Sequence, residues 1–116
     1  MRPSIAVEDA VQTLGANIRN ARLRRRLPQS VVAERAGVSL NTLSKVENGD
    51  CGVSIGNIAS ILNAVGLLPL LSSLASSEND DAGLLMEEKN LPRRIRQKKK
   101  PSLSSWFHSA TEENQN

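Results

Sequence analysis

A chain of 116 residues has room for one small domain with short appendages, and 2% aromatic residues mean that its core must be built from Leu, Ile, Val and Ala. The single cysteine, Cys51, and the single histidine, His108, exclude a disulfide framework and leave no metal-ligand cluster, so neither a metal nor another cofactor is expected. The first ten residues lack the apolar centre of a signal peptide, and no apolar run reaches the roughly 18 residues that span a membrane, so we expect a cytoplasmic protein.

The first predicted helix spans about residues 7–25. Apolar residues recur along it at helical spacing and predict one buried face. They are Val11, Leu14, Ile18 and Ala21. Arginines crowd its last turn, at positions 22, 24, 25 and 26. Cations there suit the negative end of the helix dipole, and they would equally form a phosphate-facing patch, so both interpretations stay open.

Residues 27–49 have the spacing of two short helices joined by a tight turn. Small apolar residues give the first helix a buried stripe, and larger ones give the second a matching stripe. These are Val32, Ala33 and Ala36, followed by Leu43 and Val46. Gly37 supplies the turn. Ser39 stands at the N-cap position of the second helix, where its hydroxyl can accept from the first free amides.

The outward face of that second helix is mostly polar. It consists of Leu40, Asn41, Thr42, Ser44 and Lys45. Polar and basic groups of this kind contact phosphates and base edges, so the sequence predicts a helix that enters a DNA major groove. An ordinary helical hairpin with a solvated face is the alternative, and the common register of small residues, turn glycine and cap argues against it.

Several motifs fall together in this region: Gln29, Ala33, Gly37-Val38-Ser39, Leu43-Ser44 and Glu47-Asn48-Gly49. Together they resemble the Xre/Cro-type helix-turn-helix repressors, with a similarity that covers residues 8–75. The resemblance implies an all-α, five-helix domain like that of the lambda repressor. It also implies that the protein binds operator DNA as a homodimer, with its third helix in the groove.

The resemblance assigns roles to individual residues. With the exposed face described above, it gives these candidate DNA-binding residues: Gln29, Ser39, Leu40, Asn41, Thr42, Lys45 and Asn48. Gln29 would contact phosphate, and positions 40, 41 and 45 would read bases. A buried ion pair would join Arg22 to Glu47.

Two residues depart from the family pattern. Pro28 stands where a side-chain cap is usual, so that helix start lacks an acceptor. Leu40 stands where a polar or basic residue is common, and it could only read a thymine methyl group or pack locally.

Two further helices are predicted within residues 54–75. Ser54 can cap a helix that runs through residue 65 and is closed by Gly66, and Pro69 can begin a short fifth helix. The inner side of the fourth helix would hold Ile55, Ile58, Ile61, Leu62 and Val65. Leucines at positions 67, 68, 70, 71 and 74 exceed the needs of so small a domain, which favours a twofold homodimer. A short strand that pairs across the dimer is the alternative.

The net charge of +3 hides an uneven distribution. We divide the chain into a DNA-binding domain at residues 1–75, an acidic linker at 76–92 with room for one short helix at 83–89, and a basic block and partner-binding tail at 93–116. The block at 93–100 attracts nucleic acid through charge, or is a solvated, disordered charge run.

The tail after the basic block is polar and is expected to be largely disordered when free. It holds the only tryptophan and phenylalanine, Trp106 and Phe107, which we interpret as anchors for a partner protein, or as a fold-back contact with the chain's own domain. The preceding Leu91-Pro92-Arg93-Arg94 run resembles the tail of HipB-like antitoxins encoded beside HipA-type kinase toxins. That resemblance implies such a kinase as the partner.

The sequence offers no catalytic constellation. It has no Gly-rich phosphate loop, and paired carboxylates such as Asp80-Asp81 lie on a polar segment where solvated charge is the better interpretation. The protein is therefore expected not to be an enzyme. Two function classes remain: a sequence-specific repressor, either an autoregulating antitoxin or a repressor without a toxin, and a protein-interaction adaptor. An exposed Val31 on the second helix would favour the adaptor.

Overall fold

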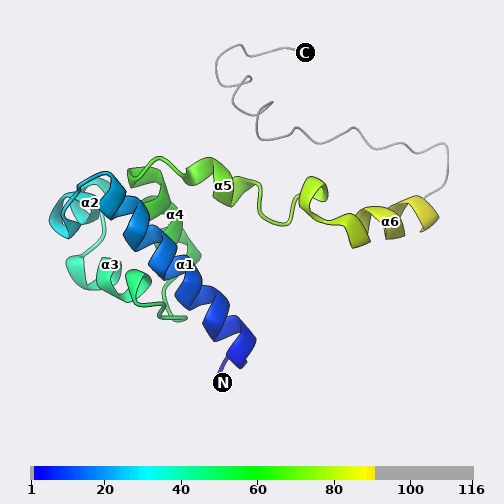
Figure 1. The fold of residues 1–116 in the computed structure, drawn as a ribbon, viewed down its shortest axis with the longest axis horizontal. Helices are drawn as coiled ribbons and strands as arrows, with labels where there is room; N and C mark the ends of the chain where they lie inside the picture. The colour runs from blue at the N-terminus through cyan, green and yellow to red at the C-terminus, as the bar shows by residue number, and fades with distance from the viewer. Residues whose placement is uncertain (1, 91–116) are drawn as a thin grey trace, which may run out of the picture. The chain divides into compact units, whose positions relative to one another are not determined.

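Residues 2–90 are described by the computed structural model, and their regular elements are all helical (Figure 1). The chain divides into two compact units, residues 1–68 and 69–116, which we describe separately. The first contains α1 (Ile5–Arg24), α2 (Gln29–Ala36), α3 (Leu40–Glu47) and α4 (Ile55–Ala64). α5 (Leu68–Ser72) begins at the boundary, and the 3-10 helix η1 (Ser77–Asn79) and α6 (Asp81–Asn90) follow. The predicted all-α fold is confirmed, and the described residues contain none of the strand that was the alternative for residues 67–74.

The core of the first unit is aliphatic, as predicted, and each of its four helices contributes to the centre. The largest fully buried side chains are Ile18 of α1, Val32 of α2, Leu43 of α3 and Ile61 of α4. α2 packs on α4, α1 packs on α3, and α2 also contacts α3. The side chains that fill this core therefore come from both helices of the helix-turn-helix and from the two helices that support them.

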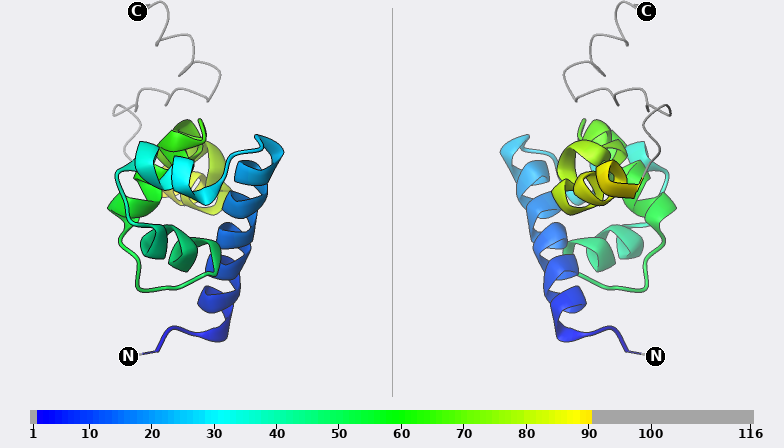
Figure 2. Two further views of the ribbon diagram at one scale, coloured as in Figure 1. Left: turned by 90° about the vertical axis from the view of Figure 1, so that its left-hand side faces the viewer. Right: turned by 90° about the vertical axis from the view of Figure 1, so that its right-hand side faces the viewer.

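α1 begins two residues earlier than predicted because Ser4 caps it. The Ser4 Oγ accepts from the Val7 amide at 3.2 Å. The predicted buried stripe is wrong at Leu14, whose side chain is 37% exposed. Figures 1 and 2 show that the first turns of α1 extend past the neighbouring helices.

The turn between α2 and α3 forms at Gly37, as predicted. Gly37 has φ = 70°, a left-handed conformation that costs glycine little. The Val38 amide bonds the Ala33 carbonyl at 3.0 Å, and the Gly37 amide bonds the Glu34 carbonyl at 3.1 Å. These bonds satisfy carbonyls at the end of α2 and fix the direction in which α3 leaves.

The predicted N-cap of α4 forms, but only part of its predicted buried face is buried. The Ser54 Oγ accepts from the Asn57 amide at 3.1 Å, and Gly66 follows the helix with φ = 81°. Ile61, Leu62 and Val65 are buried as predicted, whereas Ile55 is 68% exposed and Ile58 is half-buried. Ile55 is the first residue of α4, and the buried residues Ile61 and Leu62 lie in its second half.

The described part of the second unit is short and lightly packed. α6 spans residues 81–90, longer than the predicted 83–89, because Asp80 caps it through a 3.1 Å bond from the Gly83 amide. None of residues 81–89 is buried. The basic block and the tail with Trp106 and Phe107 lie outside the described residues, so their predicted disorder and partner contacts stay predictions.

Candidate nucleic-acid interface

The start of α3 is fixed by a pair of hydroxyl groups. The Ser39 Oγ accepts from the Thr42 amide at 3.0 Å and donates to the Thr42 Oγ1, also at 3.0 Å. The N-cap prediction is therefore confirmed. Both residues are also candidate DNA contacts, and the cap leaves each hydroxyl partly occupied within the chain.

α3 separates cleanly into a buried and an outward side. Leu43, Val46 and Glu47 are buried. The exposed residues are Leu40, Asn41, Lys45 and Asn48, with Ser44 half-buried among them. At 3.6 residues per turn these positions lie on one side of the helix. All the predicted base-reading residues thus share one accessible face.

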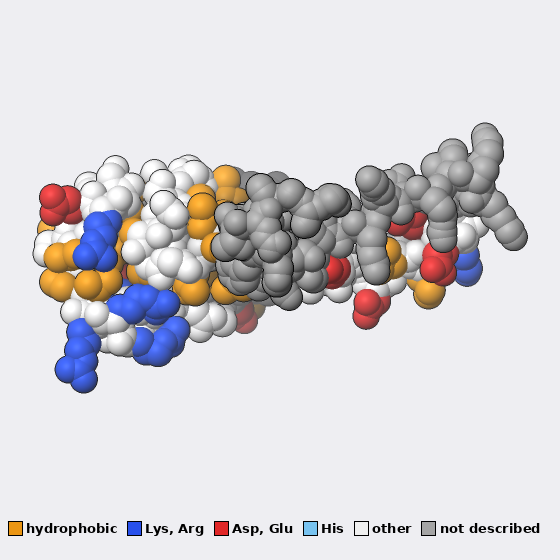
Figure 3. Space-filling model, turned by 90° about the horizontal axis from the view of Figure 1, so that it is seen from above, with side chains coloured by type: hydrophobic (Ala, Val, Ile, Leu, Met, Phe, Trp, Pro, Cys, Tyr) orange, Lys and Arg blue, Asp and Glu red, His pale blue; other side chains and the backbone are white. Residues whose placement is uncertain are grey.

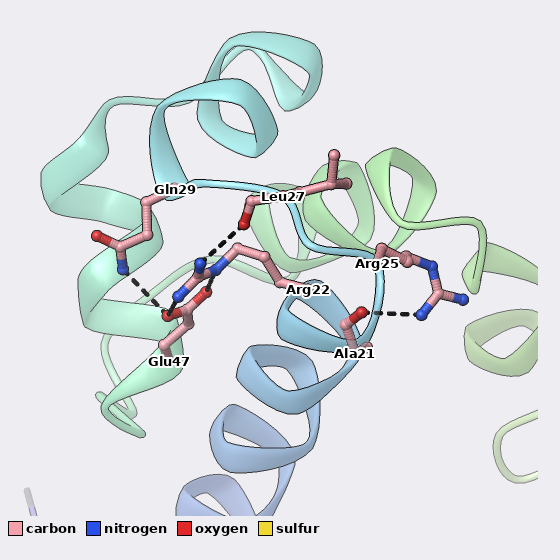
Figure 4. A network of polar contacts seen from close by, with 6 residues as sticks. All are labelled: Ala21, Arg22, Arg25, Leu27, Gln29 and Glu47. Carbon is pink, nitrogen blue, oxygen red and sulfur yellow. Dashed lines mark hydrogen bonds and ion pairs between the residues drawn. The ribbon is translucent and has the colours of Figure 1, made fainter.

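A buried ion pair joins α1 to α3 (Figure 4). The Arg22 Nε donates to Glu47 Oε2 at 2.7 Å and its Nη2 donates to Glu47 Oε1 at 3.0 Å, with side-chain exposures of 8% and 3%. The hydrogen bond to Glu47 raises the pKa of Arg22 above its ordinary value against the opposing effect of desolvation. The guanidinium thus stays charged, and the structure brings together the two residues that the resemblance paired.

The same carboxylate binds the first residue of α2. The Gln29 Nε2 donates to Glu47 Oε1 at 3.0 Å, and the Arg22 Nη1 donates to the Leu27 carbonyl at 3.0 Å (Figure 4). These bonds tie α1, the loop before α2, and α2 itself to the end of α3. They also assist a helix start that has no side-chain cap, because Pro28 stands at the N-cap as predicted.

Gly15 marks a second junction between α1 and α3 that sequence reasoning missed. A Cβ atom at this position would lie within 3.0 Å of the Val46 carbonyl, the Glu47 carbonyl and the Gly49 amide. All three are backbone atoms, so rotating a side chain could not relieve the clash. The available signal was a glycine inside a helix, which usually has a packing reason. Without a side chain at Gly15, the end of α3 rests directly on α1.

The arginines at the end of α1 serve different purposes. Arg22 points inward to Glu47, whereas Arg25 points away from it and donates from Nη1 to the Ala21 carbonyl at 2.9 Å (Figure 4). Arg25 therefore stabilises the C-terminus of its own helix. Arg24 and Arg26 are exposed. Lys and Arg side chains gather on part of the first unit in Figure 3.

Other predicted features fall outside this interface. Cys51 is an exposed free thiol. The expectation of an exposed Val31 is wrong, since this side chain is half-buried. Within residues 2–90, no group of three His, Cys, Asp or Glu side chains could hold a metal ion. None of the helices in that part of the chain combines the length and apolarity that a membrane crossing requires.

Comparison with known proteins agrees with the geometry of α2 and α3. A family model described as a helix-turn-helix domain matches residues 13–73, which is more than half of the chain. No curated protein and no solved structure matches the chain. The match contains both helices of the motif, the Gly37 turn and the supporting α4. The chain belongs to the helix-turn-helix domain family.

Proposed function

We propose that this protein is a sequence-specific DNA-binding transcriptional repressor of the Xre type. The observation that carries the proposal is the outward side of α3, where Asn41, Lys45 and Asn48 are exposed on a helix anchored by its buried side. Amide side chains pair with base edges, and lysine pairs with guanine or phosphate. A rigidly held helix lets these groups meet a duplex without reorganisation.

The polar network beneath α3 is compatible with a phosphate contact by Gln29. A glutamine amide has two N–H donors, and Glu47 accepts from the Nε2 group. The second donor remains for a phosphate oxygen. The carboxylate would then orient Gln29 for the DNA backbone while Arg22 neutralises its charge.

Operator selection from a random duplex pool, run with purified protein at a stated salt concentration, tests the proposal. We expect one enriched motif, and Asn41→Ala and Lys45→Ala should each weaken its binding by about 1 to 3 kcal/mol without lowering the melting temperature. Arg2→Ala is a matched control, because this exposed residue lies outside the proposed interface. Equal binding by wild type and both α3 variants would contradict the assigned face.

We further propose that the repressor is a homodimer. Leu70 and Leu74 are 49% and 66% exposed, which leaves apolar surface for a second copy. A twofold dimer would bind a palindrome whose half-sites lie about one DNA turn, roughly 34 Å, apart. Ultracentrifugation at micromolar concentration checks this, and a monomer both free and on DNA would contradict it.

The finer proposal is a cytoplasmic, autoregulating antitoxin without enzymatic activity. It rests on the sequence at residues 91–94 and on Trp106 and Phe107, which would anchor the tail to a HipA-type kinase toxin. Titration with the protein encoded beside this one should give tighter binding to the full chain than to a chain ending at Lys100. Equal affinities for the two chains would contradict the tail's role and leave the DNA-binding proposal untouched, whereas no binding by either chain would leave a repressor without a toxin as the alternative.

A further inference from the structure

Leu40 is the one side chain on the outward side of α3 that offers no polar group. It is the first residue of the helix, and it is 51% exposed. We propose that Leu40 contacts the C5-methyl group of a pyrimidine in the major groove. The inference rests on the proposed DNA-binding function, because it states what one part of the α3 face recognises.

The position of Leu40 follows from its neighbours. It precedes Asn41 directly and lies one turn before Ser44, at the edge of the outward side of α3. The N-terminal residues of a recognition helix are the ones that reach base edges. The Ser39–Thr42 hydrogen bonds hold the backbone at this end, so the Leu40 Cα is fixed in place.

The chemistry of the groove restricts what a leucine can read there. Most other groups on the base edges are hydrogen-bond donors or acceptors, and the thymine C5-methyl is the large apolar one. Leucine against a cytosine amino group or a guanine oxygen would remove water and return no hydrogen bond. Leucine against a methyl group buries apolar surface on both partners. Leu40 therefore favours thymine and opposes guanine and unmethylated cytosine at one position of each half-site.

Two kinds of base carry this methyl group, namely thymine and 5-methylcytosine. Asn41 beside Leu40 is the residue type that pairs with adenine N6 and N7. A step that contains A·T pairs would therefore suit both residues. We take thymine as the base that the protein meets at this position, and the methyl group itself as the feature it recognises.

The experiment uses the tightest duplex from the operator selection. Each thymine is replaced in turn by deoxyuridine, which lacks only the C5-methyl. At one position in each half-site, the replacement should weaken wild-type binding about fourfold, which corresponds to the burial of one methyl group. Leu40→Ala should bind the parent duplex more weakly and show no further loss with deoxyuridine there. Asn41→Ala is the matched control and should keep the fourfold loss.

A second set of duplexes tests the effect of the methyl group separately from that of the rest of the base. At the same position, wild type should bind 5-methylcytosine more tightly than cytosine, whereas Leu40→Ala should bind both equally. Wild-type protein that binds the two equally would overturn the proposal. The wild-type series needs no variant, so a Leu40→Ala protein that failed to fold would not remove the test.

The outcomes distinguish this inference from the proposed function. If no duplex is enriched, the DNA-binding function and the Leu40 contact both fail. If a duplex binds through Asn41 and Lys45 but every deoxyuridine duplex binds like the parent, the function stands and the Leu40 contact is wrong. A deoxyuridine loss that persists in Leu40→Ala assigns the methyl contact to another residue, and that result also overturns the inference.

Discussion

α3 and α6 are short helices of similar length that begin in the same way and end up in opposite environments. Ser39 caps α3, and Asp80 caps α6, each through a side-chain oxygen that accepts from an amide in the first turn. α3 nevertheless buries three of its eight residues, whereas none of residues 81–89 of α6 is buried. A cap starts a helix, and buried partners are what position it.

The sequences of the two helices explain the difference. Leu43, Val46 and Glu47 return to one side of α3 at intervals of three and four residues, and Glu47 meets a charge partner there. The apolar residues of α6 are consecutive, from Leu84 to Met86, so they point in different directions. α6 also carries more acidic than basic residues, which would repel phosphate, whereas the outward side of α3 carries Lys45.

The largest expected effect comes from removing the charge partner beneath α3. Glu47→Ala leaves Arg22 charged and buried, and it also takes the acceptor from Gln29, so the domain should lose about 3 to 5 kcal/mol of stability. Denaturant unfolding followed by circular dichroism measures the loss. Glu78→Ala, in the exposed η1 segment, is the control and should change little. An unchanged midpoint for Glu47→Ala would mean that α3 is not held by this pair.

Turns and helix caps, which depend on residues a few positions apart, were predicted correctly from the sequence. Gly37, Ser39 and Ser54 each control a turn or a helix start through neighbours within a few positions, and the structure places all three as predicted. The Arg22–Glu47 pair spans 25 positions, and only the family resemblance suggested it.

Burial and close packing were predicted less accurately because they depend on helices that are distant in the sequence. Helical spacing put Leu14 and Ile55 on buried faces, yet they are 37% and 68% exposed. Gly15 meets the end of α3, which follows it by about thirty positions, and nothing in the local pattern marks that partner. Periodicity gives the direction of a side chain but not how far its neighbours extend.

A smaller loss of stability is expected from a substitution at Gly15, where α1 contacts the backbone of α3 directly. Gly15→Ala forces a methyl group against the Val46 and Glu47 carbonyls, and overpacking of this kind costs about 1 to 3 kcal/mol. Gly56→Ala in α4 is the matched control, because its Cβ would meet only the Ser54 Oγ at 3.9 Å and alanine favours a helix. Thermal melting should therefore move down for Gly15→Ala and slightly up for Gly56→Ala. Equal shifts would show that α1 and α3 can separate freely.

The caps allow the role of Ser39 in stability to be separated from its role in DNA binding. Ser39→Ala and Ser54→Ala each remove one cap bond of about 3 Å, so each should cost about 1 kcal/mol of stability. Only Ser39→Ala should also weaken operator binding, since it loosens the end of α3 that carries Leu40. Melting curves and DNA titrations on both variants decide this. An equal loss of DNA affinity in the two variants would assign the effect to general destabilisation.

The smallest effect on stability is expected from a substitution in α6. Leu85 is 60% exposed, so Leu85→Ala should change the stability of dilute protein by no more than about 0.5 kcal/mol. Leu43→Ala, at a side chain with no exposure, provides the contrast and should cost about 2 to 5 kcal/mol. Melting at two protein concentrations sharpens the comparison, because a helix covered by a second copy would lose stability only when the protein is concentrated enough to associate. A large loss for Leu85→Ala at both concentrations would show that α6 packs within its own chain, and its contrast with α3 would then be wrong.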